Sequence, residues 1–345
     1  MTKTLERILM TVQKPARYVG GEYNQIVKPR SEVELRVAFC FPDTYEIGMS
    51  NLGMRILYAV LNRMPGVWCE RVFAPWADME DALRSHDLPL YALESGDALN
   101  EFDVIAFTVG YEMSYTNILN MLRLGKVPMR AENRTELKHL VIAGGACVFN
   151  PEPLADFVDL FVIGEGEELD CEVLELYRTA KREDWDKQHF LREAVKIEGV
   201  YVPSLYEVSY NTDGTVQAYT PVYDDIPKKV TKQIIRDLDK VYFPDRVVMP
   251  YIETVHDRIM LEVYRGCIRG CRFCQAGMLY RPTREKDVEV LKQYAYKMLK
   301  STGHEEISLS SLSSSDYSQL KELVNFLIDE FKGKGINISL PSLRI

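Results

Sequence analysis

Three cysteines, Cys267, Cys271 and Cys274, are the residues whose type and spacing most clearly suggest chemistry. Their spacing, C-x-x-x-C-x-x-C, lets one tight loop turn three thiolates onto one small face. Soft sulfur ligands of this kind bind iron–sulfur clusters or zinc. A cubane cluster offers four irons, so three local cysteines leave one iron without a protein ligand. That iron is then available to a substrate or a cofactor.

Zinc is the alternative, with His256, His304 or another cysteine as the further ligand. Structural zinc usually has four protein ligands, often from two paired motifs, and this sequence has no second C-x-x-C. Disulfides are not expected, because seven cysteines is an odd number and nothing in the sequence suggests secretion. The spacing therefore favours a cluster over zinc.

The residues around the cysteines predict how the chain presents them. Residues 258–264 read as a buried strand, and Gly266 and Gly270 bracket the first two cysteines. The thiols therefore fall on a loop just past a strand end, where open α/β folds place their chemistry. Further β/α units are predicted from a helix at 286–300, a strand at 306–311, a helix at 316–331 and a strand at 336–340.

The region before the cysteines has its own pattern. Apolar runs at 35–41, 72–75, 90–93, 104–109, 139–145 and 160–164 alternate with helical patterns at 51–63, 79–86, 114–123 and 167–180. This alternation predicts an α/β domain with a doubly wound parallel sheet, covered by helices on both faces. Residues 198–219 read instead as a β-hairpin, and four prolines then punctuate an extended connection.

The cysteine loop resembles the signature of the radical S-adenosylmethionine (radical SAM) enzymes, with the aromatic Phe273 just before the last cysteine. The resemblance implies a 4Fe-4S cluster whose open iron chelates SAM. One electron, from a donor such as a flavodoxin or ferredoxin, cleaves SAM to a 5′-deoxyadenosyl radical, which takes a hydrogen atom from a substrate. Phe273 is then expected to line the adenine side.

In that family the next strand end usually carries a glycine-rich segment that contacts the methionine part of SAM. This chain has a serine run there, and the candidate contacts are Ser310, Ser311 and Ser313. The alternative is that these serines cap the helix predicted to begin near Asp316.

A second resemblance concerns glycines that follow the predicted strands. Gly144-Gly145, Asn150-Pro151-Glu152-Pro153 and Gly164-Glu165-Gly166-Glu167 form a series similar to the cobalamin-binding domain of cobalamin-dependent radical SAM proteins. The resemblance implies cobalamin across the carboxyl ends of the strands. The implied contacts are Gly144, Gly145, Gly164, Glu165 and Gly166, together with Asp43, Tyr45 and Gly48 after the first strand.

One feature departs from that family, because Tyr45 stands where many cobalamin proteins have a histidine that binds cobalt. A neutral phenol is a poor cobalt ligand, so we expect any cobalamin to bind without a protein lower ligand. Two alternatives stay open: the glycines only make tight turns, or the domain binds no cofactor.

The predicted organisation is an N-terminal arm (1–30), a cobalamin-binding, flavodoxin-like domain (31–180), a β-hairpin and extended linker (181–255), and the first part of a (β/α) radical SAM partial barrel (256–345). The chain resembles the N-terminal part of a longer protein, so we expect the isolated chain to turn over poorly. The net charge of −9 argues against a broad nucleic-acid surface. We expect a cytoplasmic protein without a membrane partner, because the sequence has no signal peptide or membrane-spanning run.

Three functions are consistent with these features. The first is a radical SAM enzyme, in its cobalamin-dependent form a methyltransferase that acts on an unactivated carbon. The second is a methylthiotransferase-like enzyme with another cluster in the N-terminal domain, for which Cys40, Cys69 and Cys147 are the available ligands. The third is a non-enzymatic interaction module that binds a cluster or zinc. The sequence does not identify the substrate.

Overall fold

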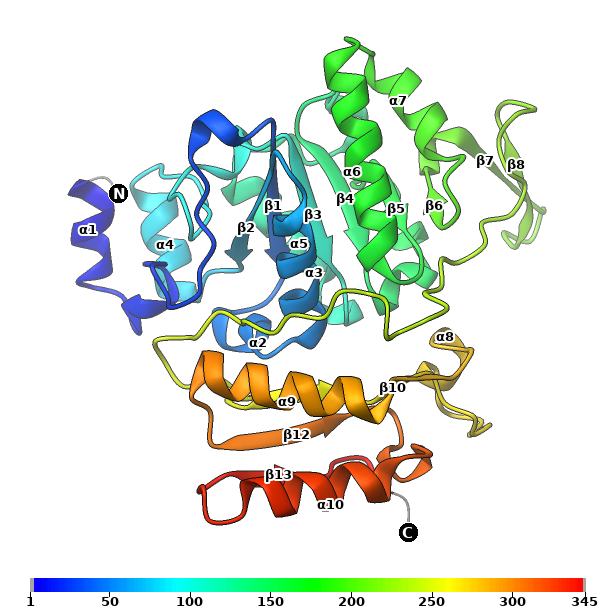
Figure 1. The fold of residues 1–345 in the computed structure, drawn as a ribbon. Helices are drawn as coiled ribbons and strands as arrows, with labels where there is room; N and C mark the ends of the chain where they lie inside the picture. The colour runs from blue at the N-terminus through cyan, green and yellow to red at the C-terminus, as the bar shows by residue number, and fades with distance from the viewer. Residues whose placement is uncertain (1–2, 344–345) are drawn as a thin grey trace. The chain divides into compact units, whose positions relative to one another are not determined.

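The computed structural model describes residues 3–343, which fold into two compact units (Figure 1). We call the first the sheet unit and the second the cysteine unit. The sheet unit comprises Met1–Gly21, Ile26–Gly48 and Val60–Ile234, and the cysteine unit comprises Glu22–Gln25, Met49–Ala59 and Ile235–Ile345. Within residues 3–343, no helix is both long and apolar enough to cross a membrane.

A six-stranded sheet forms the centre of the sheet unit. Its strands are β1 (Leu35–Phe41), β2 (Val67–Phe73), β3 (Val104–Thr108), β4 (Leu140–Gly144), β5 (Leu160–Val162) and β6 (Val200–Tyr201). They lie in the order β2-β1-β3-β4-β5-β6, and all neighbouring pairs are parallel except β5 and β6. The first five strands have the flavodoxin-like order, in which the chain reverses direction across the sheet between β1 and β3. The predicted doubly wound parallel sheet is therefore confirmed.

Helices cover both faces of this sheet, as its apolar strands require. They are α1 (Lys3–Leu9), α4 (Ala77–Ser85), α5 (Tyr115–Leu124), α6 (Gly166–Arg182) and α7 (Lys187–Ala194), while the residues of α2 (Tyr45–Met49) and α3 (Leu52–Arg63) are divided between the two units. Figure 1 shows α6 on one face and α5 on the other. The predicted N-terminal arm is part of the core, because Leu5, Ile8 and Leu9 of α1 pack into the same buried cluster as α4 and α5.

Two local predictions for this unit are wrong. Residues 90–93 do not add a strand to the sheet, because Tyr91 forms only an isolated bridge with Ala98. The segment lies beside the edge of the sheet, where the Leu93 backbone N–H donates to the Arg71 carbonyl. In the predicted linker, residues 200–201 are the sheet strand β6, and α7 precedes them. The hairpin that was predicted nearby consists of β7 (Tyr206–Tyr210) and β8 (Val216–Pro221).

The cysteine unit repeats the β/α pattern on a smaller scale. Its parallel sheet has the order β13-β12-β9, with β9 (Ile259–Glu262), β12 (Glu306–Ser310) and β13 (Asn337–Ser339). The connecting helices are α9 (Val288–Thr302) and α10 (Leu320–Phe331). A separate antiparallel pair joins β10 (Tyr264–Arg265) to β11 (Arg284–Glu285), with the short helix α8 (Ala276–Leu279) between them. These elements are the predicted first part of a β/α barrel.

Candidate functional site

The three cysteines lie on a loop whose two ends are joined at its base. Directly after β9, Tyr264 pairs with Glu285 and Arg265 pairs with Arg284 in the β10–β11 ladder. Everything from residue 266 to residue 283 therefore projects from the carboxyl end of β9 as one closed loop. In parallel β/α folds this end of the strands carries the chemistry, so the loop occupies the expected place.

Backbone N–H groups donate hydrogen bonds to two of the sulfur atoms of this loop. The Arg269 N–H donates to the Cys267 Sγ at 3.4 Å, and the Gly277 N–H donates to the Cys274 Sγ at 3.4 Å. A backbone hydrogen bond from the Cys274 N–H to the Cys271 carbonyl, at 3.0 Å, holds the last two cysteines on one turn. All three cysteines are partly exposed and none is in a disulfide. Hydrogen bonds to cysteine sulfur are among the features that tune iron–sulfur clusters.

The three cysteine thiols do not form a single-ion site in the structure. Among the residues that the structure describes, no three His, Cys, Asp or Glu side chains come close enough together to hold one metal ion. In a cubane each cysteine binds a different iron, so the three thiols need not converge on one point.

Neither histidine that the zinc alternative offers as a further ligand lies beside the cysteines, and a further cysteine in that role stays a prediction. His256 precedes β9 and contacts Arg258, and His304 precedes β12 and lies 3.6 Å from an Asp257 carboxylate oxygen. Both histidines are thus at the amino ends of the strands, whereas the cysteines follow the carboxyl end of β9. Burial lowers the pKa of both histidines.

Phe273, which is expected to line the adenine side of SAM, is 93% exposed in the structure. Ile268 and Met278 on the same loop are also largely exposed, at 66% and 55%. An aromatic face in solvent can stack on a ligand base. The contact with adenine stays a prediction.

The serine run directly follows β12, close to the cysteine loop. The Ser311 and Ser314 hydroxyls are 3.0 Å apart, and Ser310 ends the strand. Ser313 is 2% exposed, and its Oγ is buried with no hydrogen-bond partner. A buried hydroxyl without a partner is costly, so Ser313 is suited to contact a ligand. This is the feature of the segment that best fits a bound cofactor.

The capping alternative for these serines is wrong. Helix α10 begins at Leu320 rather than near Asp316, and its N-cap residue is Gln319. Residues 314–316 form a separate 3-10 turn, and Ser313, which precedes that turn, makes no side-chain capping bond. The serines therefore do not satisfy the backbone donors of α10.

In the sheet unit, the loop after β1 is packed into the core. Tyr45 is 1% exposed and lies edge-on to Phe73, with ring centroids 5.3 Å apart. Gly48 lies against the same ring, since a Cβ there would be 2.6 Å from the Phe73 Cδ1. The Asp43 carboxylate accepts the Thr44 backbone N–H at 2.7 Å. The Tyr45 phenol is therefore enclosed by the core rather than exposed to solvent. A contact of cobalamin with Asp43, Tyr45 or Gly48 stays a prediction.

The glycines after β4 and β5 meet the chain's own backbone. Gly145 has φ +107°, and a Cβ there would lie 2.7 Å from the Val109 carbonyl oxygen. Gly144 lies at the end of β4 beside Val162. Gly164 has φ +128°, and a Cβ there would lie 2.5 Å from the Gln233 backbone nitrogen.

The segment around Gln233 runs beside the end of β5. Gln233 donates its N–H to the Ile163 carbonyl at 2.9 Å, and its own carbonyl accepts the Glu165 N–H at 3.1 Å. Gly166 is the first residue of α6. The tight-turn alternative thus accounts for Gly145 and Gly164 without a ligand. A contact of cobalamin with these residues stays a prediction.

Apolar side chains are exposed at the same edge of the sheet. Ile47 follows β1, Trp76 follows β2, and Tyr111 and Met113 follow β3. Their exposed fractions are 42%, 48%, 60% and 72%. These loops flank the point between β1 and β3 where the strand order reverses, the usual binding position in such folds. Sequence reasoning missed them, because isolated apolar residues in loops carry no spacing signal.

The sheet unit offers no second cluster site among its described residues. Cys40 and Cys69 are fully buried within β1 and β2, and burial raises the pKa of both thiols well above the ordinary value. Burial also raises the pKa of Cys147 to about 11. Because Cys40 and Cys69 are enclosed within the sheet strands and Cys147 is also buried, the burial of these thiols disfavours the methylthiotransferase alternative.

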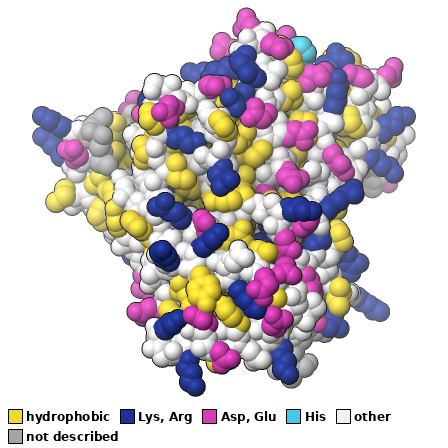
Figure 2. All heavy atoms as spheres, in the orientation of Figure 1, with side chains coloured by type: hydrophobic (Ala, Val, Ile, Leu, Met, Phe, Trp, Pro, Cys, Tyr) yellow, Lys and Arg dark blue, Asp and Glu magenta, His cyan; other side chains and the backbone are white. Residues whose placement is uncertain are grey.

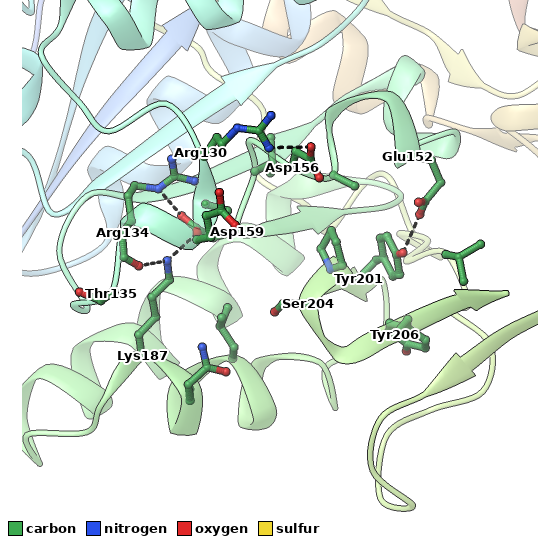
Figure 3. A pocket seen from close by; sticks show the side chains of 18 residues that line it. Arg130, Arg134, Thr135, Glu152, Asp156, Asp159, Lys187, Tyr201, Ser204 and Tyr206 are labelled. Carbon is green, nitrogen blue, oxygen red and sulfur yellow. Dashed lines mark hydrogen bonds and ion pairs between the residues drawn. The ribbon is translucent and has the colours of Figure 1, made fainter.

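A separate polar hollow of about 500 Å³ lies in the sheet unit (Figure 3). Asp159, which directly precedes β5, accepts from Arg134 at 3.0 Å and from Lys187 at 2.6 Å. On the other side, the Tyr201 hydroxyl donates to the Glu152 carboxylate at 2.6 Å. All these polar groups are paired with one another. The hollow lies at the amino end of β5, away from the edge that the glycines follow.

Charge is mixed on the face drawn in Figure 2, where acidic and basic side chains are interspersed. The sequence 265–284, in contrast, contains five arginines and no acidic residue, although the whole chain has a net charge of −9. Sequence reasoning singled out the cysteines of this stretch and missed its arginines.

Comparison with known proteins identifies the class. Residues 53–203 match the family model for the N-terminal region of radical SAM proteins, and residues 261–345 match that of the radical SAM superfamily. The chain belongs to the radical SAM superfamily. A domain of this kind implies a 4Fe-4S cluster and SAM as cofactors.

Among individual proteins, the chain is 27% identical over 309 residues to the uncharacterized protein MJ0966 of Methanocaldococcus jannaschii. That match covers 89% of this chain and 55% of the relative, so the chain spans about half of the relative's length.

Two solved structures of TsrM, a radical SAM methyltransferase from Kitasatospora setae, are similar in fold. The one with cobalamin and a 4Fe-4S cluster bound has a TM-score of 0.52 at 12% identity, covering 88% of this chain and 53% of that one. The one with tryptophan substrate and a SAM analogue bound has a TM-score of 0.49 at 14% identity, covering 88% of this chain and 54% of that one. At such identities the likeness concerns the fold alone.

Proposed function

We propose that this chain is the cofactor-binding part of a cobalamin-dependent radical SAM methyltransferase. One observation carries the proposal: a flavodoxin-like sheet of order β2-β1-β3-β4-β5 precedes a β/α unit that presents three cysteines on a closed loop. TsrM, which is similar in fold, was solved with cobalamin and a 4Fe-4S cluster bound. Because the chain spans about half of its relative, the substrate pocket of the whole protein is outside this proposal.

Different residues of the cysteine unit would bind the cluster and SAM. The cluster and SAM supply one-electron cleavage of the sulfonium, and methylcobalamin supplies the methyl group. Cys267, Cys271 and Cys274 would hold three irons as thiolates. The hydroxyls of the serine run, with the buried Ser313 Oγ foremost, would accept or donate hydrogen bonds to the polar end of SAM.

The sheet unit would bind cobalamin at the carboxyl ends of β1 and β3, beside the point where the strand order reverses. The exposed Trp76, Tyr111 and Met113 side chains would contact the corrin face, since they are apolar and lie on the loops at that edge. Tyr45, on the loop after β1, is buried against Phe73. This loop would therefore supply no lower ligand to the cobalt.

Reduction of the cluster requires an external one-electron donor. We expect a small carrier such as a flavodoxin or a ferredoxin to supply it. The positive charge of residues 265–284 favours an acidic carrier.

The test is anaerobic reconstitution with iron, sulfide and hydroxocobalamin, followed by metal analysis and by absorption and electron paramagnetic resonance (EPR) spectra. We expect about four irons and one cobalt per chain. The triple Cys267/Cys271/Cys274→Ala variant should lose the iron and keep the cobalt. Cys171→Ala is the matched control, because Cys171 is also partly exposed but lies on α6.

Other outcomes have defined meanings. If the chain binds iron but no cobalt, the sheet unit has only a structural role. The chain would then belong to a radical SAM protein that catalyses another type of reaction. Zinc without iron would overturn the proposal altogether and would favour an interaction module. If a Trp76→Ala variant keeps full cobalt loading, the proposed contact between Trp76 and the corrin is wrong.

A further inference from the structure

Arg269 connects the cysteine loop to its surroundings through three different groups. Its backbone N–H donates to the Cys267 Sγ at 3.4 Å, and its carbonyl accepts from an Arg281 guanidinium nitrogen at 3.4 Å. Its own guanidinium donates to both carboxylate oxygens of Asp316, with Nε at 2.9 Å from Oδ2. The residue that orients one cluster sulfur is therefore held by a charged partner outside the loop.

Asp316 belongs to the segment that carries the serine run. It ends the 3-10 turn Ser314–Asp316 and donates its backbone N–H to the Ser313 carbonyl at 2.9 Å. Only 12% of the Asp316 side chain is exposed, against 44% for Arg269. The same Ser313 carbonyl also accepts the hydroxyl of Tyr264, a buried residue three positions before Cys267. Two polar links thus join the serine run to the region of the first cysteine.

The chemistry of this pair makes it suitable for fixing geometry. An arginine that meets a carboxylate through two parallel hydrogen bonds is held in orientation as well as in distance. A lysine or a neutral amide reproduces only part of this arrangement. The guanidinium orientation fixes the Arg269 side chain, and the Arg269 backbone N–H is directed at sulfur. The pair is thus placed to define where Cys267 points.

We propose that Arg269 and Asp316 are a positioning pair that prearranges Cys267 for the cluster and couples the cysteine loop to the serine run. The second half of this inference rests on the proposed function, in which the serine run contacts SAM. Coupling of this kind is reciprocal: SAM at the serine run steadies the cluster loop, and a loaded loop raises the affinity for SAM.

The first test uses the metal-free chain and needs no cofactor. Iodoacetamide labelling under anaerobic conditions, read by mass spectrometry of peptides, gives the alkylation rate of each cysteine. Arg269→Gln and Asp316→Asn should each raise the rate at Cys267 by about three- to tenfold, in keeping with the loss of a charge-assisted pair. The rate at Cys171 serves as the internal reference. Circular dichroism confirms that each variant is folded.

Arg272→Gln is the matched control variant. Arg272 lies on the same loop, is exposed and carries the same charge, but it is Arg269 that makes the bidentate ion pair with Asp316. This variant should change the Cys267 rate less than about twofold. The effect of the Arg269→Gln/Asp316→Asn double variant should be smaller than the two single effects combined, because the shared ion pair is removed only once. Additive effects, or an equal effect of Arg272→Gln, would refute the positioning role.

The second test uses the reconstituted chain. SAM titration is followed by the change in the EPR spectrum of the reduced cluster. Asp316→Asn should require about three- to tenfold more SAM for half of that change, and Arg272→Gln should match the wild type. An unchanged titration would overturn the coupling. If the wild type binds no iron, the proposed function fails, whereas the labelling experiment still decides whether the pair positions Cys267.

Discussion

Replacing Gly164 with alanine tests whether this glycine serves a ligand or the fold. Gly164 has φ +128°, a conformation that side chains other than glycine rarely adopt, and an added Cβ would lie 2.5 Å from the Gln233 backbone nitrogen. The substitution therefore strains the backbone and displaces the segment that pairs with it. We expect a large loss of stability in the chain without any cofactor.

The size of this loss follows from two contributions. A side chain forced into a sparsely populated backbone region costs about 1–3 kcal/mol. The two backbone hydrogen bonds of Gln233, at 2.9 and 3.1 Å, contribute about 0.5–1.5 kcal/mol each if they break. Together these contributions amount to about 2–6 kcal/mol. This is a large part of the free energy of unfolding of a typical domain, which is about 5–15 kcal/mol. The expected fall in the thermal midpoint is about 10 °C.

The assay is urea and thermal unfolding of the cofactor-free chain, followed by circular dichroism. Gly110→Ala is the matched control, because Gly110 follows β3 of the same sheet and a Cβ there would have open space. The control should change the free energy of unfolding by less than about 1 kcal/mol. If Gly164→Ala leaves the cofactor-free stability unchanged and lowers only cobalamin binding, the backbone argument is wrong and the ligand role is favoured.

Three further predictions concern particular side chains. Asp159→Asn should lower the free energy of unfolding by about 3–5 kcal/mol in urea, because it leaves two buried cations unpaired, whereas the exposed Asp156→Asn should cost less than about 1 kcal/mol. Burial raises the pKa of Asp170 to about 7, above the value of about 4 in an unfolded chain. The folded state then holds its proton more tightly, so stability should fall as the pH rises from about 4 to about 7, and Asp170→Asn should flatten that decline in urea midpoints. Ser313→Ala removes no hydrogen bond of the fold, so it should keep the thermal midpoint and weaken SAM binding by about two- to tenfold; an unchanged affinity would exclude Ser313 from the cofactor site.

The fold was largely readable from the sequence because its strands are continuous apolar runs. Residues 35–41 and 104–108 are buried almost throughout, so burial on both faces produced an unambiguous pattern. Residues 90–93 have the same apolar character but lie beside the sheet edge without joining it. A buried segment that pairs with a sheet strand and one that does not look alike in a sequence, because both contain apolar side chains.

The site was predictable only where ligand chemistry fixes residue spacing. The three cysteines could be found because one cluster needs three thiols on a short loop. Gly164 was assigned to a ligand, whereas the structure places the Gln233 backbone beside it. The Arg269–Asp316 pair carried no sequence signal, since its partners are 47 positions apart and arginine is common on loops. Such long-range partners become visible only when strands β9 and β12 are placed side by side.

The ladder at the base of the cysteine loop has an evolutionary consequence. Tyr264 and Arg265 pair with Glu285 and Arg284, so the chain leaves the barrel and returns to it at one fixed place. Residues inserted or deleted between these two ends alter the loop alone, while the register of β9 and the start of α9 are preserved. The length of the cysteine segment and the number of its arginines can therefore change during evolution, while the strands that hold the segment stay the same.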